Sequence, residues 1–290
     1  MAAQTPLRIA LERRPHTAAI LDRVLPAPRH LEVEFVEVAP INAAFRRMIR
    51  SSEFDICEMA VGTHYLARAH GYDLMALPVF LARHYPHAAV QVNDEAGVRS
   101  PADLAGRRVG SRSFTMTTAL WARGAFARSF ALPLDDVQWV IADEEHVPGV
   151  KLPANVEYLP GADLRAMLRA GDLAAGIGLA VDDPHVRPLW TDPGPVQAEW
   201  LASTGADPVN HTVVVAERVL ARHPGIAHDL YAWFLESERL SWPDGRDGAT
   251  SYGLDANRRA LDVLLELTRE QLPDEPALPA SAQSCFLPVT

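Results

Sequence analysis

Hydrophobic and polar positions along this chain follow two different periods. Alternating or continuous apolar runs predict β-strands at residues 7–12, 30–38, 56–62, 107–111, 137–142, 156–160, 174–180 and 211–217. Apolar residues spaced three and four positions apart predict α-helices at residues 41–55, 114–130, 225–242 and 255–272. Strands and helices follow one another through most of the chain, which is typical of an α/β protein with largely parallel sheets.

One helix–strand unit occurs twice. Residues 45–60 (FRRMIRSSEFDICEMA) and 164–179 (LRAMLRAGDLAAGIGL) align without gaps. A chance likeness between two short segments is one explanation, and two lobes built alike is the other. Ligands of α/β sheets bind beyond the carboxyl ends of the strands, so Gly176 and Gly178 would leave room there for a ligand to approach the backbone.

We therefore expect two similar α/β lobes with mixed, mostly parallel sheets and a ligand cleft between them. Lobe one would hold residues 1–90 and 211–290, and lobe two would hold residues 91–210, with crossovers near residues 90 and 210. Closure of the two lobes about a hinge is the motion expected around a ligand.

Composition limits the class of protein. The chain has 290 residues, 48% of them hydrophobic, and a net charge of −10, which argues against a nucleic-acid surface. No apolar run is long enough to span a membrane, and the N-terminus shows no signal-peptide pattern, so we expect a cytoplasmic protein. In that compartment Cys57 and Cys285 are expected to be free thiols. The oligomeric state is open, with a homo-oligomer among the alternatives.

Several kinds of chemistry have little support. Lys151 is the single lysine among the 27 basic residues, so it is the one candidate for Schiff-base catalysis, and its position between two prolines predicts an exposed loop. The chain contains no strand-linked GxGxxG, no GxxxxGK[ST] and no GxSxG motif. We expect neither a cofactor nor a bound metal.

Hydroxyl side chains crowd the turn between the strand at 107–111 and the helix at 114–130. They are Ser111, Ser113, Thr115, Thr117 and Thr118. The N-terminus of a helix presents unpaired N–H groups and a partial positive charge, so this turn is a candidate receptor for a carboxylate or phosphate. Ordinary N-capping by a serine or threonine is the alternative.

Arginine and histidine side chains stand at the ends of several predicted strands. They are Arg14 and His16 after the first strand, Arg83 and His87 in LPVFLARHYPHAAVQVN (77–93), and His211 before the strand at 211–217. Arginine can bind a carboxylate, and an imidazole can donate a proton. A solvated turn, a zinc pair in the RHYPH segment without further ligands nearby, and a structural role for His211 are the alternatives. If these strands share a sheet, the groups converge on one small anionic ligand.

Four segments resemble the 4,5-dihydroxyphthalate decarboxylase family, which has the fold of type II periplasmic binding proteins. They are residues 54–71, 77–93, 97–126 and 204–234, with 97–126 the nearest in pattern. The chain departs from the family at LERRPHT, in place of a Gly-Asp-Tyr-type turn, and at HYPH, where the family has an aromatic-Arg-His group. By resemblance, the site would include Glu58, Arg83, His87, Thr118 and His211.

The resemblance implies cofactor-independent decarboxylation of a hydroxylated, phthalate-like aromatic acid. Arg83 and the helix start at 113–118 would bind a carboxylate, His87 or His211 would protonate the ring carbon, and Glu58 would polarise a phenol. One alternative is a cytosolic protein that binds a small anionic metabolite without changing it. Another is an unrelated α/β fold in which the histidines are structural.

Overall fold

The computed structural model describes residues 5–242, 252–275 and 278–289, which fall into two compact units. Unit 1 comprises residues 1–83, 209–258 and 277–290, and unit 2 comprises residues 84–208 and 259–276. The sequence analysis places all of residues 211–290 in lobe one, whereas residues 259–276 belong to unit 2. The reason is helix packing, because Leu267 lies so close to Gly124 that a Cβ at Gly124 would come within 2.5 Å of it.

Unit 1 is built on a five-stranded sheet in the order β2-β1-β3-β11-β4. Its strands are β1 Leu7–Ala10, β2 Val33–Phe35, β3 Ile56–Ala60, β4 Leu74–Ala82 and β11 His211–Ala216. β1 runs parallel to β2 and β3, while β11 runs antiparallel to β3 and β4. Four of the five strands run in one direction and β11 opposes them, so the sheet is mixed and mostly parallel in strand direction, as the sequence predicts.

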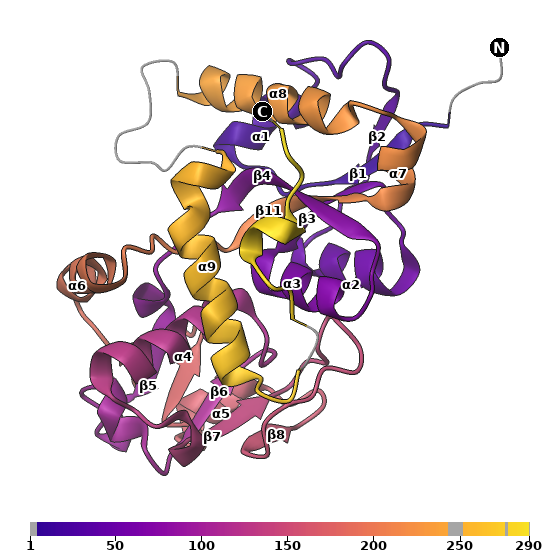
Figure 1. The fold of residues 1–290 in the computed structure, drawn as a ribbon. Helices are drawn as coiled ribbons and strands as arrows, with labels where there is room; N and C mark the ends of the chain where they lie inside the picture. Colours follow the sequence, from indigo (N-terminus) through magenta and orange to yellow (C-terminus); the bar gives the residue numbers. More distant parts are fainter. Residues whose placement is uncertain (1–4, 243–251, 276–277, 290) are drawn as a thin grey trace. The chain divides into compact units, whose positions relative to one another are not determined.

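Helices cover both faces of this sheet, with α1 and α8 on one face and α2 and α3 on the other (Figure 1). The helices of unit 1 are α1 Pro15–Leu21, α2 Asn42–Ser51, α3 Val61–Ala69, α7 Glu217–Arg222 and α8 Ile226–Ser241. Helix α9, Leu254–Gln271, begins in unit 1 and continues in unit 2. In α2 the buried residues are Ala44, Phe45, Met48 and Ile49, which is the helical spacing seen in the sequence.

Unit 2 contains a six-stranded sheet in the order β10-β5-β9-β6-β7-β8. Its strands are β5 Val90–Asn93, β6 Arg108–Ser111, β7 Gln138–Ile141, β8 Val156–Tyr158, β9 Ala175–Ile177 and β10 Val186–Pro188. Its helices are α4 Thr117–Phe130, α5 Leu164–Ala170 and α6 Gly194–Thr204. A 3₁₀ turn, Pro101–Leu104, begins after its N-cap residue Ser100.

The repeated helix–strand unit has the same place in both sheets. The first copy forms α2 and β3, and the second forms α5 and β9. β3 lies between a parallel strand, β1, and an antiparallel strand, β11. β9 likewise lies between parallel β6 and antiparallel β5. The sequence repeat therefore marks two sheets of like topology.

The two glycines of the second copy differ in the space beside them. A Cβ at Gly176 would come 2.5 Å from a methyl carbon of Leu179, and one at Gly178 would come 3.1 Å from the methyl carbon of Met116. At Gly176 the buried Leu179 therefore fills the expected space, whereas Gly178 is exposed and lines a pocket with Arg112 and Arg165, so room for a ligand there stays a prediction.

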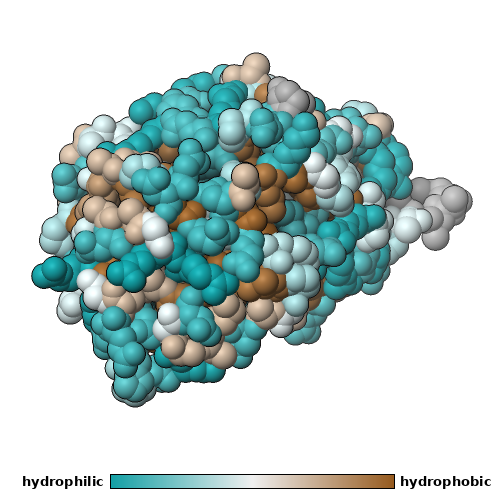
Figure 2. Space-filling view, turned by 90° about the horizontal axis from the view of Figure 1, so that it is seen from below, coloured by the Kyte–Doolittle hydropathy of each residue, from teal (hydrophilic) through white to brown (hydrophobic). Residues whose placement is uncertain are grey.

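The face drawn in Figure 2 is mainly hydrophilic, with apolar residues in separate patches. Within the described part of the chain, no helix is both long and apolar enough to cross a membrane. Cys57 and Cys285 are free and buried, which confirms that they do not form a disulfide. Buried valines of β11 and apolar residues of β3 and β4 form the centre of unit 1.

Candidate functional site

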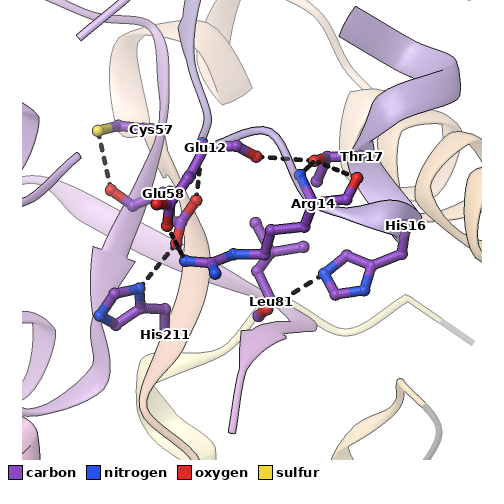
Figure 3. Close-up of polar contacts among 8 residues, drawn as sticks. All are labelled: Glu12, Arg14, His16, Thr17, Cys57, Glu58, Leu81 and His211. Carbon is purple, nitrogen blue, oxygen red and sulfur yellow. Dashed lines mark hydrogen bonds and ion pairs between the residues drawn. The ribbon is translucent and has the colours of Figure 1, made fainter. Parts of the chain in front are cut away.

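Polar side chains of unit 1 gather where β1 and β3 end (Figure 3). β11 is antiparallel to β3, and in the register of the sheet its first residue, His211, lies beside Ala60, the last residue of β3. The start of β11 thus meets the carboxyl end of β3. The chain after β1 adds Glu12 and Arg14 to the same place.

Glu58, in the middle of β3, is the centre of this group. Its Oε1 accepts hydrogen bonds from Arg14 Nη2 at 2.8 Å and from His211 Nδ1 at 2.7 Å, and its Oε2 accepts one from the Glu12 backbone N–H at 2.9 Å. Arg14 also forms an ion pair with the Glu12 carboxylate. We call Glu12, Arg14, Glu58 and His211 the Glu58 cluster.

The Glu58 carboxylate stays ionised although its side chain is fully buried. Burial raises its pKa, but the hydrogen bond and charge of His211, followed by those of Arg14, outweigh that effect and lower the pKa to about 2. The sequence suggested that Glu58 polarises a substrate phenol. In the structure both oxygens are buried and accept hydrogen bonds from groups of the chain, His211 among them, and the polarising role stays a prediction.

His211 is partly exposed, with 20% of its side chain accessible, as are Arg14 with 22% and Glu12 with 44%. A carboxylate only accepts hydrogen bonds, so Nδ1 carries a proton and donates a hydrogen bond to Glu58. The ring stands edge-on to Phe45, with 5.1 Å between centroids. Nε2 has no hydrogen-bond partner among the described residues. The ring is thus held by one nitrogen and offers the other for proton transfer.

Two other predicted ligands, His16 and Arg83, pack at the end of β4 in the same unit. His16 is 4% exposed, donates from Nε2 to the Leu81 carbonyl at 3.1 Å, and packs against the ring of Trp242. Arg83 donates to the side chain of Asn257 and lies over a phenylalanine ring of β4. Their roles as carboxylate ligands stay predictions.

His87 has a different environment, in unit 2. Its side chain is 3% exposed, neither ring nitrogen has a hydrogen-bond partner in the described part of the chain, and Trp190 and Trp200 pack against it. Burial lowers its pKa to about 4, so the imidazole is neutral at pH 7. Of the two candidate acids, the geometry therefore favours His211.

His87→Leu is expected to make the protein less sensitive to acid. A lowered pKa in the folded state costs stability as the pH falls from 6.5 towards 4, because the unfolded chain binds the proton more readily. We expect the variant to match the wild type at pH 8 and to exceed its unfolding free energy by about 1 kcal/mol at pH 5, after allowance for solvent screening. Urea denaturation at both pH values measures this, with His185→Leu, at an exposed position of unit 2, as the matched control. If the unfolding free energy falls equally between pH 8 and pH 5 in the wild type and in His87→Leu, the prediction is wrong.

The hydroxyl-rich turn before α4 already holds a carboxylate, that of Glu145. The backbone N–H groups of Phe114 and Thr115 donate to it at 2.6 and 3.1 Å, and the Thr115 hydroxyl donates as well. Burial raises the pKa of Glu145, and these donors act in the opposite direction. The N-cap of α4 is Met116, with no side-chain cap, so simple capping does not explain the hydroxyls. A ligand carboxylate would not find these two N–H groups open.

The remaining hydroxyls of the turn differ in access. Ser111 donates to the Ser113 carbonyl at 3.1 Å, and both are buried, as is Thr117. Thr118, at the second position of α4, is partly exposed. Ser113, Thr115, Thr117 and Thr118 stay predicted ligands, with Thr118 the most accessible of them.

Arg123, which the sequence analysis did not select, supports this turn from beneath. The buried guanidinium donates from Nη2 to the Phe114 carbonyl at 2.5 Å and from Nε to Gln271 at 2.6 Å, and it stacks 3.8 Å from the Phe114 ring centroid. Burial lowers its pKa to about 9. An arginine among the apolar residues of a predicted helix could have indicated a buried, hydrogen-bonded guanidinium at Arg123. Glu145 lies in an aperiodic loop, where no such signal exists.

The described residues contain no group of three or more His, Cys, Asp or Glu side chains placed to hold a metal ion. The Glu58 cluster instead combines a buried carboxylate, an arginine and an imidazole that is hydrogen-bonded through one of its two nitrogens. Such an arrangement suits proton transfer to or from a bound molecule.

Comparison of the sequence with known proteins identifies relatives of this chain. The NMT1/THI5-like family model matches residues 29–143. A 4,5-dihydroxyphthalate decarboxylase from Comamonas testosteroni is 28% identical over 212 residues, which cover 68% of this chain and 64% of that relative. A 4,5-dihydroxyphthalate decarboxylase from Pseudomonas putida is 31% identical over 190 residues, covering 58% of this chain and 74% of that relative.

A solved structure with a similar fold is a putative periplasmic sulfonate-binding protein, SsuA, from Methylobacillus flagellatus KT. It covers 98% of this chain and 92% of its own, with 13% identity and a TM-score of 0.59. At that identity the likeness concerns the fold alone, and it confirms the predicted periplasmic-binding-protein-like architecture.

Proposed function

Because this chain belongs to the 4,5-dihydroxyphthalate decarboxylase family, we propose that it removes a carboxyl group from a hydroxylated, phthalate-like aromatic acid without a cofactor. The observation that carries the proposal is the partly buried hydrogen bond of 2.7 Å between Glu58 and His211. It fixes an imidazole whose other nitrogen is available to a substrate. Glu58 is then a positioning residue, and His211 is the catalytic acid.

The proposed reaction begins with transfer of the Nε2 proton of a doubly protonated His211 imidazole to the ring carbon that bears the carboxylate, while Nδ1 keeps its proton and its hydrogen bond to Glu58. A ring hydroxyl para to that carbon supplies electron density, so a new C–H bond forms and the ring temporarily loses aromaticity. The bond from this carbon to the carboxylate then breaks, its electron pair restores the aromatic ring, and CO2 leaves. His211 recovers its proton from solvent. Each step uses groups of this chain, the substrate and water.

Binding of the substrate needs groups that stabilise a carboxylate. We retain Arg83, Arg14, His16, Ser113, Thr115, Thr117 and Thr118 as the proposed set. Arg14 is already paired with two carboxylates, and two N–H groups near Thr115 serve Glu145, so we expect the strongest contribution from Arg83 and Thr118. The small anionic ligands implied by the fold relatives agree with this choice.

Incubation with 4,5-dihydroxyphthalate tests the proposal directly. We expect CO2 release in proportion to protein concentration, without added metal or cofactor, together with a rise in melting temperature at saturating ligand. Headspace analysis of CO2 and liquid chromatography of the aromatic product give the stoichiometry. A thermal shift without CO2 would favour a binding protein, and the absence of both would remove this substrate class. The proposed cytoplasmic location is tested separately by cell fractionation.

A further inference from the structure

A pocket of about 470 Å³ lies in unit 1, where β1 and β2 end. Leu11, Glu12 and Arg13 line it from the link after β1, Leu21 lines it from α1, and residues 35–41 complete the wall. β1 lies between β2 and β3 in the sheet, so β1 separates this pocket from the strands that carry Glu58 and His211. The pocket shares Glu12 with the Glu58 cluster, but Glu58 and His211 themselves are not among its lining residues.

The pocket is apolar and suited to a small ring. Of its eleven lining residues three are charged, Glu12, Arg13 and Glu37, which leaves eight apolar ones. Its volume falls in the range of small-molecule sites, roughly 300–1,000 Å³. The wall residue Phe35 is braced from outside by stacking on Trp233, with 6.4 Å between centroids, and by the guanidinium of Arg23 at 5.4 Å.

The carboxylates of the pocket accept hydrogen bonds, and its one arginine is already paired with a carboxylate. The Arg13 guanidinium is engaged by both oxygens of Asp22. The Glu12 carboxylate is paired with Arg14, while exposed Glu37 forms no ion pair with any described residue. An ionised carboxylate offers acceptors only. A ligand with O–H donors is thus favoured here, and a ligand carboxylate is repelled.

We propose that this pocket binds an uncharged single-ring aromatic compound that carries hydroxyl groups. Its ring packs against the apolar wall, and its hydroxyls donate to the carboxylates of Glu12 and Glu37. The proposal does not depend on decarboxylation, because binding can be measured without turnover. Failure of the decarboxylase assay would leave it standing, and loss of ring binding would leave the assay unaffected.

Titration of the labelled full chain with catechol and with benzoate tests the proposal. The two probes are of similar size, but catechol is an uncharged donor and benzoate is an anion. We expect catechol to bind at least about tenfold more tightly in this pocket, because the like charge of Glu37 opposes benzoate. NMR chemical-shift changes at residues 35–41 report occupancy of the pocket itself. Benzoate binding there as tightly as catechol would overturn the inference.

A substitution that fills the pocket gives the second test. Val38→Trp places an indole in the ligand's space, and we expect it to weaken catechol binding by about tenfold or more. Val24→Trp is the matched control, since Val24 is 73% exposed and lies outside the lining. If melting curves show that Val38→Trp is unfolded, Leu21→Phe replaces it. Unchanged catechol affinity in a folded, filled variant would refute the proposed site.

Discussion

His211→Gln is expected to reduce kcat by about 10²- to 10⁴-fold, which is the usual contribution of a positioned general acid. The glutamine amide can still donate a hydrogen bond to Glu58, so the buried carboxylate keeps a partner. The variant lacks only the nitrogen that exchanges a proton with substrate. Because the substrate carboxylates are bound by other groups, KM is expected to change much less than kcat. Initial rates of CO2 release over a range of substrate concentrations measure both.

Three further variants make the outcome specific to His211. His30→Gln is the matched control, since His30 is an exposed histidine of the same unit that pairs with Asp229. It is expected to leave turnover unchanged. His211→Ala should be as inactive as His211→Gln, and His87→Ala should retain activity. Wild-type turnover in both alanine variants would rule out both histidines as the acid, and loss restricted to His87→Ala would transfer the role to unit 2.

Strong hydrophobic periodicity made most of the fold predictable. The continuous apolar strand β11 and the amphipathic helices α2 and α9 appear where their patterns indicate. The strand expected at 30–38 is shorter, Val33–Phe35, because only its central residues pair with β1. β10, Val186–Pro188, was not predicted, since three residues with one buried apolar side chain carry no measurable period.

The candidate site was predictable residue by residue but not as a set of contacts. Placing Glu58 in a central strand and His211 at a strand entrance followed from the sequence. Their contact requires β11 to run antiparallel beside β3, which a hydrophobic pattern does not specify. Glu145 could not be predicted as the partner of Thr115, because that contact joins two loops 30 residues apart. Long-range polar pairs of this kind depend on tertiary packing.

Glu58→Gln is expected to lower the unfolding free energy at pH 7 by about 3 kcal/mol. The change in pKa from 4.5 to about 2 on folding corresponds to a contribution of that size, and removal of one partner from a buried ion pair costs a similar amount, about 3 kcal/mol or more. Without its anion, the cluster leaves Arg14 with Glu12 as its remaining carboxylate partner. Urea denaturation at pH 7 measures the difference. Glu53→Gln, which removes a partly exposed carboxylate paired with Arg47, is the matched control.

The pH dependence of this loss identifies its origin. A carboxyl group whose pKa is lowered on folding stabilises the native state above its unfolded pKa, and the contribution disappears as the pH falls from 4.5 through 2. Wild type and Glu58→Gln are therefore expected to converge in stability between pH 4.5 and pH 2, whereas a packing defect would persist at every pH. The variant should also lower kcat more than it raises KM, because a neutral amide holds the His211 ring less firmly than a carboxylate does. A difference in stability that stays constant down to pH 3, with unchanged kcat, would show that the Glu58 charge neither stabilises unit 1 nor positions His211.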